Sequence, residues 1–399
     1  MDEKKRKKQL DPTDKSRRPI RMIGALLIVG AAFYLARLEF IYVGPARNGR
    51  FVFSHYRFVE ERWDHPRLQL LRSREKLDAV VAPGKTEFEK IVLLRKWAHD
   101  QWKEGSTFYY PPWDGVEILD LARRHRNYGF CGQYAMVFLQ ACLSVGLHAR
   151  YVDIGHFLTE VWSDDYNRWI VMDPTNDLHY EKDGAPLRGR NLYAASWRDN
   201  VAGIARVGSD GTRTLVAPEE MQIWRNYSII LRNNHLSDPV VIEINGKRQL
   251  LGMKKDYRDY PLIGRTDRLA YGGEFLDWRT PDISTPTYHG RSSDDADDFR
   301  DVFNQTIIML VAKEPRRSRV KFKLLAENAP GFQTFLVRAN DVEAYAESGD
   351  EIILPLNAGV NILHARIKTR FGWLGPESEI RVFYKPDLLS RMKAFFAGG

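Results

Sequence analysis

The clearest pattern of apolar and polar positions runs from residue 131 to residue 173. Apolar residues recur three and four positions apart from Ala135 to Val145, and Gly146 follows them. This spacing predicts a helix that begins near Cys131 and ends at Gly146. Farther along, two runs rich in Val, Ile, Trp and Thr flank the polar residues 164–167, which predicts a β-hairpin.

The register of this hairpin follows from its loop. If residues 164–167 form a four-residue loop, Trp162 pairs with Trp169 and Leu158 stands opposite Asp173. His156 then lies one diagonal step from Asp173 on the same face, roughly 7 to 8 Å away at Cα. A carboxylate at that distance can reach an imidazole ring.

Cys131, His156 and Asp173 therefore form a candidate catalytic triad. In the first helical turn, unpaired N–H groups and the helix macrodipole favour a thiolate at Cys131. His156 would accept the thiol proton, and Asp173 would orient the imidazole. Taken singly, a helical Cys is more often a core residue, a His a filler and an Asp before Pro a turn former. Cys142 fits the core description.

Three segments carry a family resemblance: YGFCGQYA at 128–135, LSVGLHARYV at 143–152 and HFLTEVWSDDYNRWIVMDPT at 156–175. They resemble the transglutaminase-like branch of the papain-like thiol enzymes, and the similarity extends over about residues 86–180. The resemblance implies an α+β papain-like core and acyl transfer through a thioester.

A fourth segment, PPWDGVEIL, resembles the one in which transglutaminases carry an oxyanion-stabilising Trp, which would give Trp113 that role. The chain departs from the family at Phe157 and Leu158, which replace the usual Ala-Trp. Gln133 also stands where an acidic or aromatic residue is common.

Glu160 shares the face of His156, so Glu160 and Gln133 are candidates for supporting groups around the triad. A structural carboxylate is the competing interpretation for Glu160.

The charge is concentrated at the N-terminus. The chain has 399 residues, 44% hydrophobic and 28% charged, with a net charge of +8. Residues 1–21 hold nine Lys or Arg and four Asp or Glu, which leaves about +3 for the remainder. This distribution argues against a nucleic-acid-binding face and indicates a local role for the basic tail.

That role is membrane orientation. The tail precedes the uncharged segment Met22–Ala36, and apolar character continues to Val43 despite Arg37 and Glu39. We expect an uncleaved signal anchor at 22–43, with a cleaved signal peptide as the alternative. The positive-inside rule then keeps the tail in the cytoplasm and the rest outside it.

The remaining sequence is rich in strand patterns. Residues 227–233 and 240–251 predict strands, the latter a hairpin at Asn245-Gly246. The acidic run 294–298 invites a calcium site but lacks EF-hand spacing, so a solvated loop is preferred. Short β-runs from 305 to 387 predict an antiparallel sandwich with a weak resemblance to Ig-like modules.

The two cysteines give no structural cross-link or metal motif. Eleven helical positions separate Cys131 from Cys142 by roughly 16 Å, beyond disulfide reach. No zinc-ligand spacing occurs in the sequence. We expect no cofactor and no metal.

The sequence predicts an α+β protein with a transglutaminase-like core followed by β-rich regions. Its expected parts are a basic cytoplasmic tail (1–21), a transmembrane signal-anchor helix (22–43), a catalytic domain (44–216), a β-rich middle region (217–282), an acidic linker (283–304), an Ig-like sandwich (305–387) and a C-terminal tail (388–399).

We expect a cysteine peptidase, amidase or acyltransferase that acts on peptides or proteins outside the cytoplasm, more by hydrolysis than by crosslinking. The β-rich regions would bind glycan or envelope protein. The alternative function is a non-catalytic scaffold that binds peptide or glycan.

Overall fold

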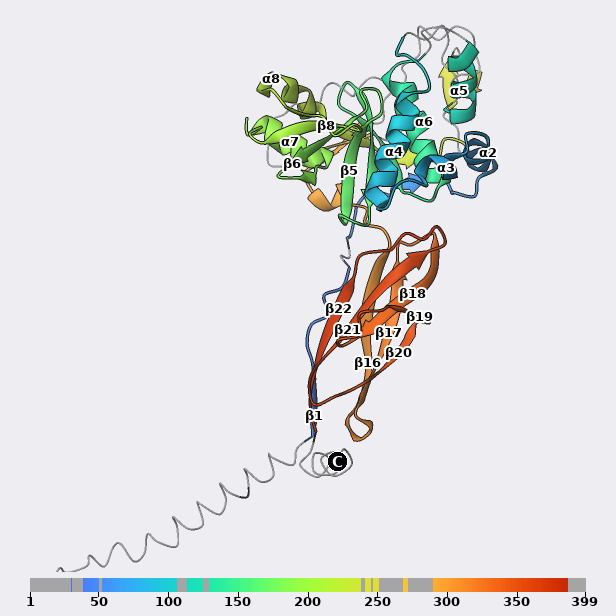
Figure 1. The fold of residues 1–399 in the computed structure, drawn as a ribbon. Helices are drawn as coiled ribbons and strands as arrows, with labels where there is room; N and C mark the ends of the chain where they lie inside the picture. The colour runs from blue at the N-terminus through green and yellow to red at the C-terminus, as the bar shows by residue number, and fades with distance from the viewer. Residues whose placement is uncertain are drawn as a thin grey trace, which may run out of the picture.

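A computed structural model describes residues 30, 39–49, 52–105, 113–124, 129–237, 241–244, 247–250, 268–271 and 290–386. Its two main parts are an α+β unit and an elongated β-sandwich below it in Figure 1. The basic tail, all of Met22–Ala36 except Gly30, and the tail 388–399 lie outside the described residues. Among the residues that are described, no helix is long and apolar enough to cross a bilayer.

The α+β unit is built on one long mixed sheet with the order β15-β14-β10-β3-β4-β5-β6-β8-β9, and β7 pairs with β6. Its strands are β3 (Ala149–Asp153), β4 (Phe157–Ser163), β5 (Arg168–Asp173), β6 (Leu178–Lys182), β7 (Ala185–Pro186), β8 (Ile204–Gly208), β9 (Arg213–Leu215), β10 (Ser228–Ile230), β14 (Arg268–Tyr271) and β15 (Gly290–Ser293). Short pairs flank it: β2 (Val59–Glu60) with β11 (Arg232–Asn233), and β12 (Val241–Ile244) with β13 (Lys247–Leu250).

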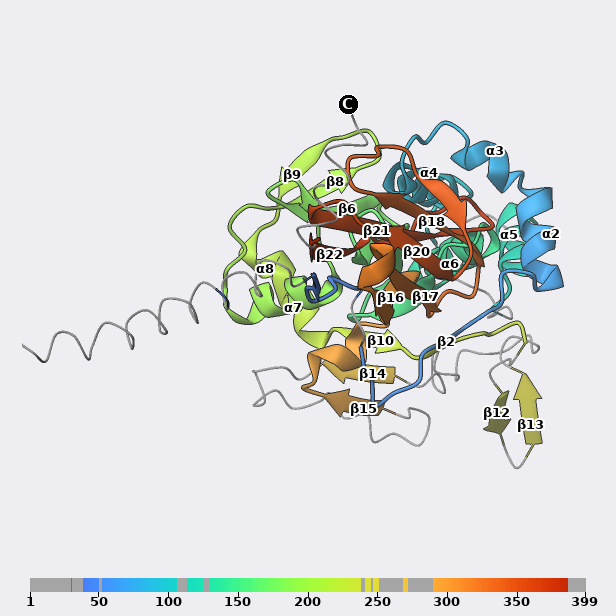
Figure 2. The ribbon, with the colours of Figure 1, turned by 90° about the horizontal axis from the view of Figure 1, so that it is seen from below.

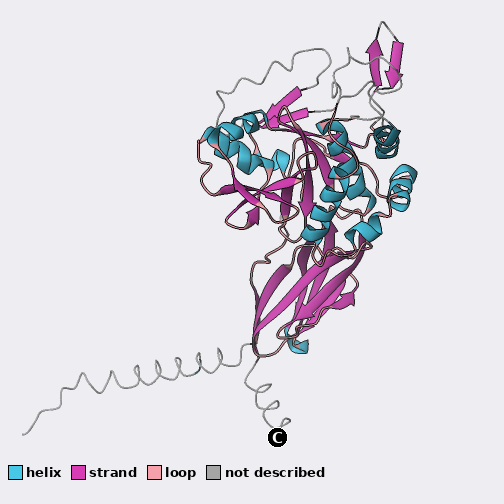
Figure 3. Cartoon of the chain, turned by 45° about the horizontal axis from the view of Figure 1, so that its top comes forward, coloured by secondary structure: helices cyan, strands magenta, loops and turns pink. Residues whose placement is uncertain are grey.

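Helices cover both faces of this sheet, as Figures 1 and 3 show. On one face lie α2 (Pro66–Arg74), α3 (Leu77–Val81), α4 (Glu87–His99), α5 (Gly115–Arg124) and α6 (Cys131–Ser144). On the other lie α7 (Gly189–Trp197), α8 (Pro218–Met221), η1 (Gln222–Asn226) and η2 (Ala296–Phe299). Alternate residues of β3 and β5 enter the two cores: Tyr151 and Met172 face α6, while Val152 and Val171 face α7.

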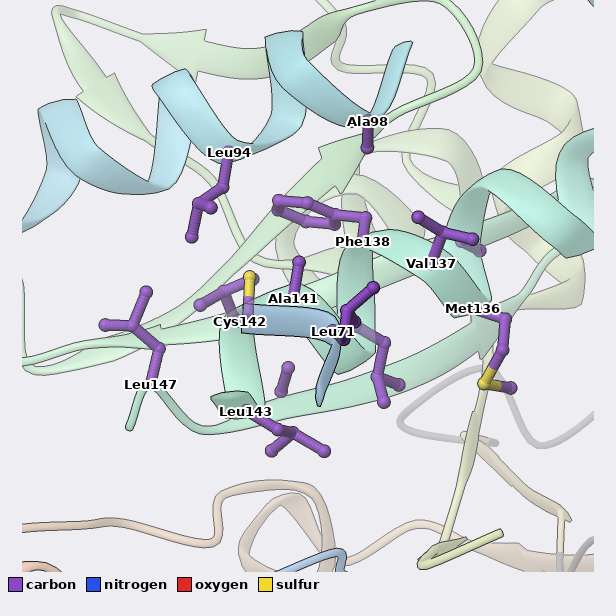
Figure 4. Packing of buried hydrophobic residues seen from close by; sticks show 14 of the residues in the cluster. Leu71, Leu94, Ala98, Met136, Val137, Phe138, Ala141, Cys142, Leu143 and Leu147 are labelled. Carbon is purple, nitrogen blue, oxygen red and sulfur yellow. The ribbon is translucent and has the colours of Figure 1, made fainter. Parts of the chain in front are cut away.

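Helix α6 is the centre of the first core. Every residue after Cys131 in this helix is buried. Figure 4 shows Phe138 between α6 and α4, close to Leu94 and Ala98. This burial explains why α6 includes Gly132, since packing outweighs the low helix propensity of glycine.

The β-sandwich consists of two antiparallel sheets, β1-β22-β21-β18-β19 and β16-β17-β20, which share one apolar core. Its strands are β1 (Phe40–Val43), β16 (Gln305–Glu314), β17 (Arg319–Glu327), β18 (Phe332–Ala339), β19 (Ala346–Ser348), β20 (Glu351–Pro355), β21 (Gly359–Thr369) and β22 (Ser378–Lys385), with η3 (Pro315–Arg317) between β16 and β17. In the view from below in Figure 2, the sandwich stands in front of the α+β unit.

Several sequence predictions are confirmed. Helix α6 begins at Cys131, Trp162 pairs with Trp169, and Ser163 pairs with Arg168 across the four-residue loop. Ile244 pairs with Lys247 on either side of Asn245-Gly246, whose own placement lies outside the described residues. The six strands expected after residue 305 are β16, β17, β18, β20, β21 and β22.

The boundary of the expected membrane helix at Val43 is wrong. Residues Phe40–Val43 form β1, which pairs with β22 from Phe40↔Lys385 to Val43↔Val382. Alternation explains this, because Ile41 enters the sandwich core while Phe40 and Tyr42 are exposed. Arg47 also bridges to Glu379, so the chain joins the sandwich before it reaches the α+β unit.

The middle region and the linker contribute to the sheet of the α+β unit. β10 pairs with β3 through Ser228↔Asp153 and Ile229↔Val152, and β14 and β15 continue the sheet. These strands are short and come from distant parts of the chain, so the composition boundaries at 216 and 282 did not reveal their pairing.

Candidate active site

Cys131 lies at the first residue of α6, partly exposed. Strands β3 and β4 hold the first turns of this helix. The Tyr151 hydroxyl donates to the Gly132 carbonyl at 3.2 Å, and the Thr159 hydroxyl donates to the Ala135 carbonyl at 3.1 Å. The nucleophile candidate therefore stands on a fixed helix end whose first N–H groups have no helical partner.

His156 immediately precedes β4, in a tight bend. Gly155 has φ +88°, a conformation that favours glycine, and its N–H donates to Asp153 Oδ1 at 2.7 Å. The bend brings His156 Nε2 to 3.0 Å from Asp173 Oδ2. The diagonal approach predicted from the hairpin register is thus present.

The electrostatics of His156 favour its charged form. Burial lowers the pKa of the imidazole, but hydrogen bonds with Asp173 and Cys131 outweigh it and raise the pKa to about 10. With Nε2 directed to Asp173, Nδ1 is the ring nitrogen left for Cys131. This arrangement suits an imidazolium beside a thiolate.

Asp173 ends β5 and is held by the turn that follows it. Its Oδ1 accepts the N–H groups of Thr175 at 3.0 Å and Asn176 at 3.1 Å. Its Oδ2 accepts the Asn176 side-chain amide at 2.9 Å as well as His156. These donors fix the carboxylate on both oxygens.

Helix α4 forms hydrogen bonds to the same turn from the side of the core. Arg95, fully buried, donates to Asp177 Oδ1 at 2.9 Å, and His99 Nδ1 lies 2.9 Å from the Thr175 carbonyl. Sequence reasoning missed Arg95, His99 and Asn176 as positioning groups. The four-residue spacing of Arg95 and His99 on one helix face was the available signal for the first two.

The other predicted site residues are also placed. Gln133 accepts the Phe130 N–H at 3.0 Å, so it caps the helix that carries Cys131. Glu160 is buried and pairs with Arg150 at 2.7 Å, while its other oxygen accepts the Gly189 N–H. These contacts are those of a structural carboxylate.

Trp113 is buried in an aromatic stack. Its ring lies parallel to Tyr151, with centroids 5.6 Å apart, and meets His235 edge-on at 4.4 Å. Tyr151 in turn bonds to the turn of α6 that follows Cys131. The stack places Trp113 one aromatic ring from the helix start, and its oxyanion role stays a prediction. Tyr109–Pro112, which precede it, lie outside the described residues.

The acidic run has a structural use. Asp295 caps η2, and Asp298 accepts hydrogen bonds from Ser293 and from the His55 N–H. His55, Asp295 and Asp298 do place one ligand atom each within 4.8 Å of the others. Because Asp298 is already satisfied by protein donors, the cluster is explained without an ion.

Comparison with protein-family models identifies part of the α+β unit. Residues 74–174 match the family model described as the transglutaminase-like superfamily. The chain carries a transglutaminase-like domain. The triad residues Cys131, His156 and Asp173 all fall inside the matched range.

Two curated relatives are peptide-N(4)-(N-acetyl-beta-glucosaminyl)asparagine amidases. The protein from Gallus gallus is 28% identical over 183 residues, 43% of this chain and 24% of the relative. The protein from Oryza sativa subsp. japonica is 29% identical over 111 residues, 27% of this chain and 22% of the relative. The chain spans about a quarter of the length of these relatives.

A solved structure, the red sea bream transglutaminase, is similar at 10% identity, covering 84% of this chain and 76% of that chain with a TM-score of 0.20.

Proposed function

We propose that this chain is a thiol enzyme that cleaves amide bonds through Cys131, His156 and Asp173. The observation that carries the proposal is the position of His156, whose Nε2 lies 3.0 Å from Asp173 Oδ2. Burial lowers the pKa of this imidazole, but its interactions with Asp173 and Cys131 raise it to about 10. That electrostatic arrangement supports an ion pair ready for nucleophilic attack.

In the proposed reaction the Cys131 thiolate attacks the amide carbonyl, and the carbon–sulfur bond forms as the carbonyl π electrons move to oxygen. The N–H of Cys131, and Trp113 by family resemblance, would hold the oxyanion. His156 gives its proton to the nitrogen, which leaves as an amine. Water, or a second amine, then resolves the thioester. Hydrolysis is favoured because water is the default acceptor.

The proposed substrates are peptides or proteins. The names of both curated relatives describe amidases of a glycosylated asparagine, so a carboxamide side chain is a reasonable first substrate class. We also propose that the uncharged segment Met22–Ala36 anchors the chain in a membrane, with the α+β unit and sandwich outside the cytoplasm. The β-rich regions would bind glycan or envelope protein there.

The second candidate is a non-catalytic scaffold that binds peptide or glycan. The composition of the site speaks against it: a scaffold would not need a partly exposed thiol beside an imidazole whose pKa is held near 10.

Turnover by the full-length protein distinguishes the two. Three probes cover the proposed classes: a denatured N-glycosylated peptide, followed by glycan release; a glutamine peptide, followed by ammonia release; and the glutamine peptide with biotin-pentylamine, followed by amine incorporation. We expect at least one product from the parent and from Cys142→Ala, and none from Cys131→Ala. Peptide binding that persists in Cys131→Ala, with no product from the parent, would support the scaffold.

A further inference from the structure

Four exposed apolar side chains meet on the outer face of the sandwich at its β1 edge: Phe40, Tyr42, Val360 and Phe383. They are 44%, 60%, 62% and 41% exposed, respectively. Tyr42 and Val360 both pair with Phe383 across neighbouring strands, so the three side chains share one face. The Phe40 ring lies 5.8 Å from that of Phe383. We call these four residues the aromatic patch.

The core of the sandwich is formed by other residues of these strands. The alternate residues Ile41, Val382 and Tyr384 point inward and supply the core contacts of β1 and β22. Three aromatic rings and a valine left together in water are costly, and contiguous exposed apolar surface commonly marks a contact site. The patch is therefore a candidate contact surface.

The patch lies at the end of the sandwich remote from the candidate active site. The opposite end of the sandwich meets the α+β unit, where the Asn304 amide donates to Asp164 and Trp373 donates to the Val145 carbonyl. Phe40 pairs instead with Lys385, near the last described residue of the chain. Figure 1 shows β1 at the end of the sandwich away from α6.

The short sequence distance between the aromatic patch and the uncharged segment Met22–Ala36 restricts which surfaces the patch can contact. Only Arg37, Leu38 and Glu39 separate Phe40 from Ala36, the end of the uncharged segment. Four residues extend at most about 14 Å. If the segment enters a bilayer, Phe40 must lie close to the headgroup layer, which is about 5–8 Å deep on each side.

The charges at this end suit such a surface. Exposed Arg316 and Arg317 lie in η3, Lys313 donates to the Ile41 carbonyl, and Lys385 pairs with Phe40. The carboxylates here are already bonded: Glu314 pairs with Arg317, Arg319 and Lys321, and Glu39 accepts the Tyr384 hydroxyl. Basic groups around aromatic rings are typical of the membrane interface, where anionic headgroups attract them.

We infer that the aromatic patch lies in the headgroup layer of an anionic phospholipid bilayer, as a second attachment beside the anchor. This inference rests on the membrane anchoring proposed above. Two attachments a few residues apart fix the tilt of the sandwich, which then acts as a spacer that holds the α+β unit away from the bilayer surface.

Depth-dependent quenching tests the inference on the full-length chain in vesicles of phosphatidylcholine and phosphatidylglycerol at a 3:1 ratio. In a Cys131→Ala background, Tyr42→Cys receives a bimane label, and buried Cys142 stays unlabelled. The matched control is Leu325→Cys, which is also exposed but sits on β17 toward the α+β unit. Brominated acyl chains should quench the label at residue 42 several-fold more than the label at residue 325.

Equal quenching at the two positions, in protein that remains with the vesicles after a carbonate wash, would overturn the inference and leave the anchor intact. Protein lost from vesicles in the wash would overturn both the anchor and the inference. A label at residue 42 that is shielded in detergent as well, in a chain that sediments as a dimer, would assign the patch to a second copy instead. None of these outcomes depends on turnover, so the catalytic proposal is tested separately.

Discussion

The two cysteines of this chain occupy one helix in opposite environments. Cys131 is the first residue of α6 and partly exposed, and its interaction with His156 contributes to the raised pKa of that imidazole. Cys142 lies eleven residues later in the apolar core, where burial raises the pKa of its thiol well above the usual value. Figure 4 shows it within the packed cluster around α6. Position along the helix therefore decides whether a thiol of this protein is buried in apolar surroundings or partly exposed near an imidazole.

The largest expected effect is the difference in reactivity between these two thiols. Iodoacetamide should modify Cys131 in the native protein at least ~10³-fold faster than Cys142, because a buried thiol reacts only when the fold opens, at a cost of about 5 kcal/mol or more. Peptide mass measures each site. In 6 M guanidinium the two rates should become similar. Comparable alkylation rates of Cys131 and Cys142 in the native protein would contradict the difference in environment between the two thiols.

The C-terminal end of α6, which carries Cys142, can be destabilised separately from the end that carries Cys131. The Trp373 indole, from the turn between β21 and β22, packs in the same core as Cys142 and donates to the Val145 carbonyl at 3.3 Å. Trp373→Ala should lower the free energy of unfolding by about 3–5 kcal/mol, measured by urea denaturation. It should also speed alkylation of Cys142.

The neighbouring Leu374 is 37% exposed, so Leu374→Ala should change stability by less than about 0.5 kcal/mol. Faster alkylation of Cys131 along with Cys142 in Trp373→Ala would mean that α6 opens as one unit.

The reactivity of Cys131 should depend on His156. An ordinary thiol is only ~0.3% thiolate at pH 6, so His156→Gln should slow alkylation of Cys131 at that pH by up to about 10²-fold. His364→Gln in the sandwich, where His364 bonds to Glu377, is the matched control and should leave the rate unchanged. A rate at pH 6 that is insensitive to His156 would remove the basis for the ion pair.

The raised pKa of His156 also predicts a trend in stability. Since the hydrogen bonds with Asp173 and Cys131, working against burial, raise the folded-state pKa to about 10, binding the proton stabilises the native state. That contribution is complete below the unfolded value of about 6.5 and is lost as pH rises through about 10. Urea midpoints should therefore fall over this range more steeply in the parent than in His156→Gln.

Sequence and structure agree best where the contacts are local. Helix periodicity located Cys131, and the four-residue loop fixed the pairing of Trp162 with Trp169, which brought His156 to Asp173. The motif also gave Trp113, but not the stack of Tyr151 and His235 around it. Trp113 lies 38 positions before Tyr151 and 122 positions before His235, and no local pattern encodes contacts over such distances.

The prediction from hydropathy was wrong at β1, where a pairing distant in sequence determines the structure. Phe40–Val43 continue an apolar segment, so hydropathy assigned them to a helix. Their pairing with β22, about 340 residues away, makes them a strand in which only alternate residues are buried. Tertiary pairing overrode the local pattern, as it commonly does for short strands.

The smallest expected effect concerns the turn after Asp173, whose hydrogen bonds hold the carboxylate that binds His156. Asn176 donates its side-chain amide to Asp173 Oδ2 at 2.9 Å, the same oxygen that binds His156. Asn176→Ala removes one charge-assisted hydrogen bond, worth about 1.5 kcal/mol, so the carboxylate should orient His156 less well. Alkylation of Cys131 at pH 6 should slow by roughly tenfold, because 1.4 kcal/mol is a factor of ten.

Asn191→Ala is the matched control, since the Asn191 side chain accepts a hydrogen bond from Arg188 on the exposed surface of α7. This substitution should leave the pH dependence of the Cys131 alkylation rate unchanged. A merely structural role for Asn176 would lower the urea midpoint without altering that pH profile, whereas a positioning role requires the profile to shift. An unchanged profile in Asn176→Ala would show that the backbone N–H groups of Thr175 and Asn176 hold Asp173 unaided.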